Sequence, residues 1–299
     1  QRLLEEYIKG NVSHDIPHEE LCELIDAFTA EFTAQYMHIS LDNDGYGKIR
    51  ALFERMKKNT VKACENILSE LASSKFKPAK LELTISDNGE TSPLRIRLSD
   101  GSDAVLGGIA DRVDTYNDGE NTYIKLIDYK SGKNTFSLDG IEKCDGIQLF
   151  VYMISICAKG SSIFGDNIKP AAAFYVTVSP EIKESELYVS VEDAENGAKD
   201  SIVRRGAVLN DAEVMQAVFG NDGKFMPKYA SDKKISYIAD EEFTETFEKL
   251  KYAVGELAEN MKKGYSEALP EKIGTYMPCE FCDYKMVCRY ESKAVKEDE

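Results

Sequence analysis

Two stretches decide the fold of this chain, AVLGGIADRVD at residues 104–114 and NTYIKLIDYK at residues 121–130. In both stretches apolar and polar side chains alternate with the period of two that is typical of a half-buried strand. The intervening YNDGEN contains the Asn, Asp and Gly residues that favour a tight turn. We therefore expect an antiparallel pair of strands here.

The same period of two predicts a larger sheet around this pair. Further strands are expected at residues 79–86, 94–99 and 171–179, and an apolar helix is expected at residues 146–158. The strands up to residue 130 should form an antiparallel meander, because turn signals separate them. A meander followed by a helix and another strand is typical of an α/β or α+β core. We therefore expect a central mixed sheet flanked by helices.

Helices extend this core on both sides. Apolar residues at spacings of three and four predict amphipathic helices at residues 19–36 and 49–72. The second helix carries Phe53, Met56, Ile67 and Leu71 on its apolar face, and a third, long helix carries Phe243, Phe247, Leu250, Val254, Leu257 and Met261. The expected division is a helical N-terminal part at 1–78, a core at 79–180, a C-terminal helical extension at 181–291 and a disordered tail at 292–299.

Composition bounds the class of protein. The chain has 299 residues, of which 42% are hydrophobic and 30% are charged, and this ordinary globular composition excludes a disordered chain. No run of about 18 apolar residues is present, so no transmembrane helix is expected. The 37 Lys and Arg residues against 53 Asp and Glu residues give a net charge of −16, which excludes a basic footprint over the whole surface. A bound metal ion can still supply local positive charge for a nucleic acid.

Seven cysteines in a chain that opens with QRLLEEYIKG point to a reducing compartment. The odd count and the charged, helix-like start argue against a disulfide framework and a secretory leader. We therefore expect a cytoplasmic protein whose cysteines are free thiols or metal ligands. The chain starts with Gln rather than Met, so we also expect a fragment of a longer protein.

Asp111, Asp128 and Lys130 form the strongest chemical motif. Asp111 is expected late on its strand, and Asp128 and Lys130 lie two residues apart at the end of the next one, so their side chains share a face. Two carboxylates beside a lysine suit Mg²⁺-assisted cleavage of phosphodiesters. The carboxylates would bind the hard cation, and the lysine would position water or stabilise charge. The spacing alone also fits a solvated hairpin with a cross-strand ion pair.

Taken together, the motifs resemble the RecB family of nucleases within the PD-(D/E)xK superfamily. The resemblance rests on GGIADRVD, LIDYKSGK and GIQLFVYM, which contain a Gly-x-x-Asp strand from Gly108, an Asp-Tyr-Lys strand end and a Gln-x-x-x-Tyr helix. It implies a restriction-endonuclease-like core and a Mg²⁺-dependent deoxyribonuclease. The implied catalytic residues are Asp111, Asp128, Lys130, Gln148 and Tyr152, with Glu82 as a weaker match. The implied Mg²⁺ ligands are Asp111, Asp128 and the backbone carbonyl of Tyr129.

Cys279, Cys282 and Cys288 form a C-x2-C-x5-C pattern near the end of the chain. Thiolates at such spacings bind zinc or an iron–sulfur cluster. With the nuclease motifs upstream, this pattern resembles the C-terminal nuclease domain of the AddB (RexB) family of helicase–nuclease subunits. In that family a fourth, upstream cysteine completes a [4Fe–4S] site. The resemblance covers about residues 1–291.

This resemblance also implies a partner and a substrate. The partner would be an AddA helicase–nuclease subunit in a heterodimer that processes double-strand DNA breaks for recombinational repair. The nuclease site would receive single-stranded DNA from the translocating complex, and no membrane partner is implied. The negative net charge fits such an arrangement, because the partner and the remainder of the subunit would hold the DNA.

Two features depart from the family pattern. The upstream cysteine has no match, since Cys22, Cys64, Cys144 and Cys157 lack its sequence context and are interpreted as small buried hydrophobes. Gln1 stands where the family has a metal-binding histidine, and His14, His18 and His38 do not fit that register. Either the fragment begins inside this motif or the sequence has lost the ligand, and both cases bear on activity.

Two alternatives compete with this interpretation. One is a stand-alone RecB-like single-strand exonuclease, against which the long segment 180–265 and the missing cysteine argue. The other is a catalytically inactive iron–sulfur scaffold that clamps DNA ends. The intact Asp111, Asp128 and Lys130 argue against a scaffold, whereas Gln1 argues for it.

Overall fold

The computed structural model describes residues 1–39, 44–130, 136, 138–141, 144, 146–177, 202–220, 235–265, 270 and 277–289. Its strands are β1 (Lys77–Ile85), β2 (Leu94–Arg97), β3 (Asp103–Leu106), β4 (Gly108–Asn117), β5 (Thr122–Lys130), β6 (Ile168–Thr177), β7 (Arg204–Leu209) and β8 (Ile235–Ile238). Its α-helices are α1 (Arg2–Ile8), α2 (His18–Phe32), α3 (Gly47–Ser73), α4 (Leu138–Ile141), α5 (Gln148–Lys159), α6 (Ser161–Phe164), α8 (Ala212–Phe219), α9 (Asp240–Lys262) and α10 (Lys285–Cys288). Short π or 3₁₀ turns lie at Thr33–Met37, Asp44–Tyr46 and Pro278–Phe281.

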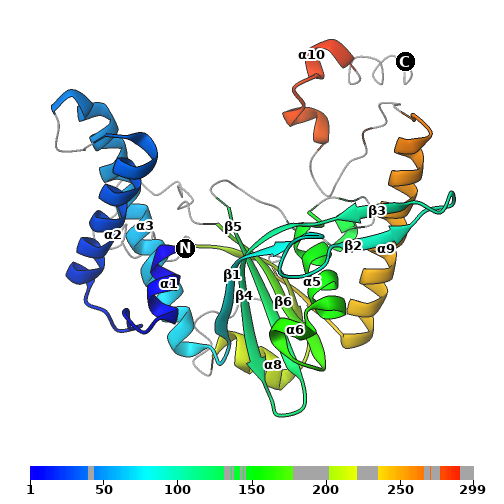
Figure 1. Cartoon of the computed structure of the whole chain (residues 1–299), viewed down its shortest axis with the longest axis horizontal. Helices are drawn as coiled ribbons and strands as arrows, with labels where there is room; N and C mark the ends of the chain where they lie inside the picture. The colour runs from blue at the N-terminus through cyan, green and yellow to red at the C-terminus, as the bar shows by residue number, and fades with distance from the viewer. Residues whose placement is uncertain are drawn as a thin grey trace, which may run out of the picture.

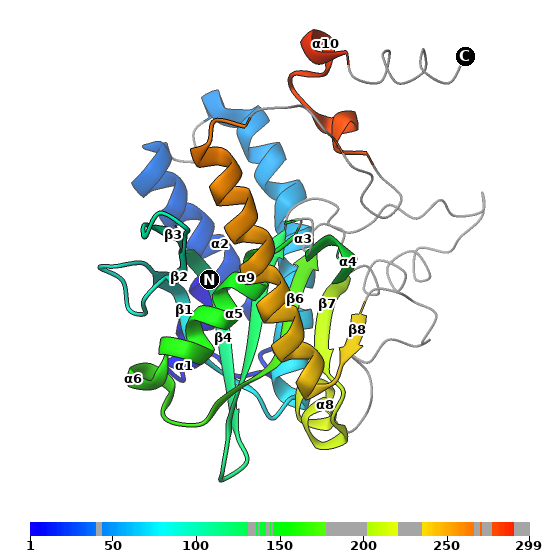
Figure 2. The same cartoon turned by 90° about the vertical axis from the view of Figure 1, so that its right-hand side faces the viewer.

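The centre of the described structure is a six-stranded mixed sheet in the order β1-β4-β5-β6-β7-β8 (Figure 1). β4 pairs antiparallel with β1 and β5, and β5 pairs parallel with β6 after the crossover that contains α5. β7 lies antiparallel to β6 and parallel to β8. Figures 1 and 2 place α1, α2 and α3 on one side of the sheet and α5, α6 and α9 on the other. The predicted α/β core, a mixed sheet flanked by helices, is confirmed.

The predicted meander is wrong. β1 pairs directly with β4, and the intervening β2 and β3 form a separate two-stranded sheet. The predicted strand at residues 104–114 is divided at Gly107, where a β-carbon would lie 2.2 Å from the carbonyl oxygen of Ile85. The backbone of β1 approaches too closely for any side chain at this point. Asp111 consequently lies near the start of β4 rather than late on its strand.

The N-terminal helices agree with the sequence in place and length. α2 and α3 occupy most of the predicted spans, although Met56, predicted on the apolar face of α3, is 50% exposed. The predicted domain boundary at residue 78 falls inside β1, and the predicted tail at 292–299 lies outside the described residues. Among the described helices, none combines the length and the hydropathy that a transmembrane span requires.

The long helix α9 buries only part of its predicted apolar face. Leu250 and Val254 are buried, whereas Leu257 is 48% exposed and Met261 is 69% exposed. The C-terminal part of α9 contacts the turn between β2 and β3 through polar groups, including an ion pair of Lys262 with Asp100. The predicted long helix is therefore present, but its apolar face is exposed beyond residue 254.

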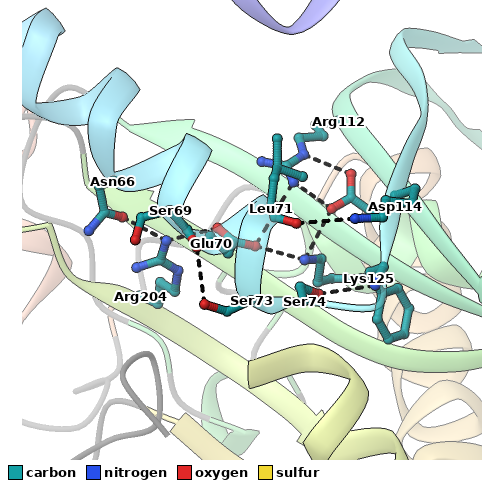
Figure 3. A network of polar contacts seen from close by, with 12 residues as sticks. Asn66, Ser69, Glu70, Leu71, Ser73, Ser74, Arg112, Asp114, Lys125 and Arg204 are labelled. Carbon is teal, nitrogen blue, oxygen red and sulfur yellow. Dashed lines mark hydrogen bonds and ion pairs between the residues drawn. The ribbon is translucent and has the colours of Figure 1, made fainter. Parts of the chain in front are cut away.

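Charged side chains are buried between α3 and the sheet (Figure 3). Arg112, Asp114 and Lys125 are 0% exposed, and Glu70 of α3 is 5% exposed. Arg112 binds Asp114 through two hydrogen bonds, with Nε–Oδ1 at 2.7 Å and Nη2–Oδ2 at 2.6 Å. Lys125 Nζ lies 3.0 Å from Asp114 Oδ2 and 2.7 Å from Glu70 Oε1. Because a buried charge is tolerated only with its partners, these contacts hold α3 against β4 and β5.

Arg204 of β7 extends this arrangement, since its Nη2 atom lies 2.8 Å from Glu70 Oε2 and 2.8 Å from Asn66 Oδ1. The buried charge cluster consists of Glu70, Arg112, Asp114, Lys125 and Arg204. The alternating sequence pattern predicts two strands here, and the structure confirms them. The pattern does not indicate that α3 covers the face of β4 and β5 that carries these charges.

Glu70→Gln should destabilise the fold by about 3 kcal/mol at neutral pH, because it leaves Lys125 and Arg204 beside a neutral group. Burial alone would raise the pKa of Glu70, but the charges of Lys125 and Arg204 outweigh burial and hold that pKa well below its ordinary value. A carboxylate with a lowered pKa stabilises the folded state above its unfolded pKa of about 4.3, and the contribution is lost as pH falls towards the folded pKa.

The measurement is the free energy of unfolding in urea for wild type and variant across pH. The difference between the two proteins should shrink as pH falls from about 5 to about 3. Glu54→Gln, on the exposed surface of the same helix, serves as the control and should show neither effect. The same pH dependence in both variants would contradict the assignment to Glu70.

Candidate active site

Three adjacent strands of the sheet each contribute one carboxylate to the same region. β1 pairs with β4 on both sides of Glu82, which therefore lies opposite Asp111. Glu82 has a backbone φ of 51°, in the left-handed region, so the regular strand is interrupted where this side chain projects. Asp128 follows on β5, the strand beside β4. The sheet thus presents a row of acidic side chains on β1, β4 and β5.

Asp111 is fixed by the point at which β4 and β5 stop pairing. The register of this hairpin runs from Asn117 opposite Thr122 to Arg112 opposite Ile127. Beyond that last pair, Asp111 Oδ2 accepts a hydrogen bond of 2.8 Å from the backbone N–H of Tyr129. The Asp111 carboxylate thereby replaces the backbone acceptor that β4 would otherwise offer to Tyr129, and this hydrogen bond holds the carboxylate against β5.

Lys130 lies within a chain of polar contacts from β5 to α5. Its Nζ atom is 2.6 Å from Asp128 Oδ2 and donates to Gln148 Oε1 at 3.2 Å. Gln148 in turn donates to the Tyr152 hydroxyl at 3.2 Å, one helical turn further along α5. The ammonium group also lies 5.4 Å from the ring centroid of Tyr175 on β6. These contacts set the direction of the lysine side chain towards Asp128.

Gly108 is required by the close approach of α5 to the start of β4. A β-carbon at this position would lie 2.2 Å from the Tyr152 hydroxyl oxygen and 2.9 Å from its ring carbon Cζ. Any side chain here would displace Tyr152 and the glutamine that it holds. The glycine of the Gly-x-x-Asp motif therefore has a packing role at the site.

Burial and the nearby charge of Asp111 disfavour ionisation of Asp128 and Glu82. Burial raises the pKa of Asp128, and the charge of Asp111 raises it further, although the hydrogen bond from Lys130 opposes both effects. Burial also raises the pKa of Glu82, again with a contribution from Asp111. A cation placed among these groups would relieve the repulsion, as expected for a site that binds a metal ion.

The donor set of this site suits a hard divalent cation. Carboxylate oxygens of Asp111 and Asp128, with the backbone carbonyl of Tyr129, are the ligands that Mg²⁺ prefers. Within the described residues, no group of three or more His, Cys, Asp or Glu side chains is arranged to hold a metal ion. Two carboxylates are nevertheless enough for Mg²⁺, which usually keeps several water ligands. The residues therefore fit an ion that is bound in part through water.

Gln1, at the position of the expected histidine, donates a side-chain hydrogen bond of 2.9 Å to Glu5 Oε1. Cys279 and Cys288 are half-buried, and Cys282 is exposed. The unmatched cysteines, Cys22, Cys64, Cys144 and Cys157, are partly buried against hydrophobic clusters.

The structure brings together the six residues that the sequence singled out as catalytic. They are Glu82, Asp111, Asp128, Lys130, Gln148 and Tyr152. Sequence reasoning missed Tyr175, which lies beneath the Lys130 ammonium group. Tyr175 sits within an apolar strand run, and no local signal separates it from core residues.

A protein-family model matches nearly the whole chain. The model described as the PD-(D/E)XK nuclease superfamily matches residues 2–289. This span includes the sheet, the row of carboxylates and the cysteine segment.

Three curated relatives are similar to this chain over nearly all of its length. The chain is 29% identical over 295 residues to a protein of Clostridium tetani, 28% identical over 305 residues to one of Alkaliphilus metalliredigens, and 27% identical over 300 residues to one of Clostridium acetobutylicum. Each of the three is named as a subunit of an ATP-dependent helicase/deoxyribonuclease. The alignments cover 96%, 97% and 98% of this chain but 26% of each relative. The chain thus spans about a quarter of the length of these relatives.

Asp128→Asn should stabilise the metal-free protein at neutral pH. An acid whose folded pKa is raised stabilises the fold while it is protonated, and this contribution is lost as pH rises through the folded pKa. The neutral amide avoids that loss, so the free energy of unfolding in EDTA should rise by ~0.5–2 kcal/mol, the usual range for a stabilising change. Urea denaturation across pH measures it, and the gain should shrink as acid protonates wild-type Asp128.

Asp166→Asn, at an exposed position after α6, is the matched control and should leave the free energy of unfolding unchanged. A variant at Asp128 that is less stable than wild type at every pH would show that the ion pair with Lys130 outweighs burial.

Proposed function

Because this chain belongs to the PD-(D/E)XK nuclease superfamily, we propose that it hydrolyses phosphodiester bonds of DNA with Mg²⁺ at the site of Asp111, Asp128 and Lys130. The observation that carries the proposal is the joint fixation of these three side chains. Asp111 is bonded to the backbone of β5, and Lys130 lies between Asp128 and Gln148.

The roles of the residues follow from their contacts. Asp111, Asp128 and the Tyr129 carbonyl would hold the ion, which when bound would polarise the phosphate and lower the pKa of a water ligand. Lys130 carries the positive charge that would orient water or stabilise charge on phosphate oxygens. Gln148 limits the directions open to Lys130, and a fixed donor stabilises developing charge better than a mobile one.

Two further residues support this arrangement. Tyr152 holds Gln148 from the next turn of α5 and packs against the start of β4 at Gly108. Glu82 lies opposite Asp111 and completes the acidic row on the β1 side. We propose that Glu82 acts on the same ion through a water ligand, since its exposed position suits such a role.

The names of the relatives support a role within a larger protein. We propose that the chain is the nuclease part of an AddB-type subunit that pairs with an AddA helicase–nuclease subunit. The complex would process double-strand DNA breaks for recombinational repair in the cytoplasm and deliver single-stranded DNA to this site. A net charge of −16 suits a nuclease part that receives DNA already held elsewhere.

The cysteine segment adds a second, structural cofactor to the proposal. Cys279, Cys282 and Cys288 would supply three ligands of a [4Fe–4S] cluster, and a fourth cysteine would come from another part of the full-length protein. The described residues do not gather the three thiols into a metal-binding group. Tyr284, Met286 and Val287, between the second and third cysteines, are 75%, 82% and 83% exposed. A cluster that joined this segment to another part of the protein would give these apolar side chains a neighbour to pack against.

Lys130→Ala in the full-length protein should lower the rate of DNA cleavage by on the order of 10²-fold or more, because one donor to the transition state is removed. The rate is measured with single-stranded DNA at saturating Mg²⁺. Lys80→Ala, at a surface position of β1 where the lysine pairs with Glu90, is the control and should cleave like wild type. Cleavage by Lys130→Ala at the wild-type rate would remove Lys130 from catalysis, whereas the absence of cleavage by the wild-type protein would favour the inactive scaffold.

Iron and acid-labile sulfide in the full-length protein test the cluster. We expect about four of each per chain, and we expect Cys282→Ala to lose them while Cys64→Ala, on α3, keeps them. Loss of the cluster should weaken folding and DNA-end binding more than the chemistry at Lys130, because the cross-link acts mainly through chain entropy. One equivalent of zinc without sulfide would replace the cluster with a zinc site.

A further inference from the structure

Tyr129 connects the candidate active site to the opposite face of the sheet. It lies between Asp128 and Lys130 on β5, so its side chain projects away from theirs. Its backbone N–H donates to Asp111 Oδ2 at 2.8 Å on the site side. Its hydroxyl accepts a hydrogen bond of 3.0 Å from Arg112 Nη1 on the α3 side. One residue therefore contacts both the acidic row and the buried charge cluster.

Arg112 is held rigidly at the other end of this connection. Its side chain is fully buried, and its Nε and Nη2 atoms bind both carboxylate oxygens of Asp114. A bidentate pair of this kind fixes the plane of the guanidinium, so Nη1 points in a set direction. Asp114 is in turn bonded by Lys125, which also binds Glu70 of α3. The donor to Tyr129 is therefore anchored by α3 as well as by the sheet.

The end of β5 needs such an anchor because its backbone is paired on one side only. The parallel register with β6 continues to Lys130 opposite Thr177, whereas the described pairing with β4 stops at Ile127. On the β4 side, Tyr129 meets the Asp111 carboxylate rather than a backbone carbonyl. A small rotation of this residue would move the amide that holds Asp111 and the carbonyl proposed as a metal ligand.

We propose that Arg112 is a positioning residue which, through the Tyr129 hydroxyl, fixes the β5 strand end and thereby the Asp111 carboxylate at the metal site. The catalytic consequence rests on the proposed nuclease function, whereas the positioning itself does not. The contact acts on the ligands from behind, in the way that hydrogen-bonded partners orient metal ligands elsewhere. A purely structural Tyr129 would contribute to folding alone and leave the Asp111 bond unchanged.

The test compares Tyr129→Phe with Tyr123→Phe in the full-length protein. Both tyrosines lie on the same face of β5, but Tyr123 is six residues away and packs against Tyr116. Each change removes one hydroxyl and keeps the ring. Urea denaturation first establishes that both variants fold.

Two measurements besides activity then report on the site. Hydrogen exchange at the residue 129 amide follows the bond to Asp111, and calorimetry with Mn²⁺ follows the metal site. Tyr129→Phe should speed exchange at this amide by about tenfold relative to neighbouring β5 amides, and weaken Mn²⁺ binding by about 10- to 100-fold, the usual loss for a partner of a metal ligand. Tyr123→Phe should change neither. The Mg²⁺ concentration for half-maximal DNA cleavage should rise by a similar factor in Tyr129→Phe alone.

Arg112→Lys tests the direction of the effect. Lysine keeps the charge beside Asp114 but has a single ammonium group, which cannot serve Asp114 and Tyr129 with the same planar geometry. Arg112→Lys should therefore speed hydrogen exchange at the residue 129 amide. The double variant with Tyr129→Phe should exchange no faster than Tyr129→Phe alone. An additive effect in the double variant would show that Arg112 does not act through Tyr129.

The outcomes separate this proposal from the proposed function. If wild type cleaves DNA and Tyr129→Phe matches Tyr123→Phe in exchange and Mn²⁺ binding, positioning by Arg112 is wrong and the nuclease function stands. If wild type does not cleave DNA but Tyr129→Phe loosens the amide, the nuclease function fails and positioning stands. If wild type binds no Mn²⁺, the exchange rates at residue 129 still decide the question.

Discussion

The pairing of charges inside the molecule is the constraint on which the other features depend. A fully buried guanidinium, ammonium and carboxylate on β4 and β5 must meet one another and the Glu70 carboxylate, since each alone would be far too costly to bury. Meeting these partners requires α3 to lie across the sheet in one place and β7 to bring Arg204 to the same carboxylate. The apolar core can tolerate small shifts of packing, but this set of partners cannot. The candidate site lies on the opposite face of the same strands, whose positions are fixed by the charge pairs on the α3 side.

Much of the site could be predicted from the sequence because its residues lie in short motifs on strongly patterned segments. The alternation around Asp111 and Asp128 predicts two strands, a turn predicts their pairing, and a four-residue spacing puts Gln148 and Tyr152 on one helical face. Local geometry alone then brings these residues near one another. The resemblance to a nuclease family rests on the same motifs and agrees with the family match along the chain.

The parts that could not be predicted depend on contacts between distant segments. Lys125 and Glu70 are 55 residues apart, and nothing near Lys125 distinguishes a buried lysine from one on a solvated strand face. The meander was the wrong expectation for a similar reason. Turn signals identify where strands end, but the pairing of β1 with β4 includes a close approach of the two backbones at Gly107. Periodicity carries no information about that distance.

β1 forms one edge of the described six-stranded sheet, and its irregularities bear on self-association. An open edge offers unpaired backbone groups to another chain and invites aggregation. Here the edge strand contains Pro78, which has no N–H to offer, and its register shifts between Pro78 and Lys80. The left-handed residue Glu82 breaks the edge again and adds a negative charge, so no long flat stretch is exposed. The distortion that brings a carboxylate to the acidic row thus also protects the protein from adding strands of neighbouring molecules.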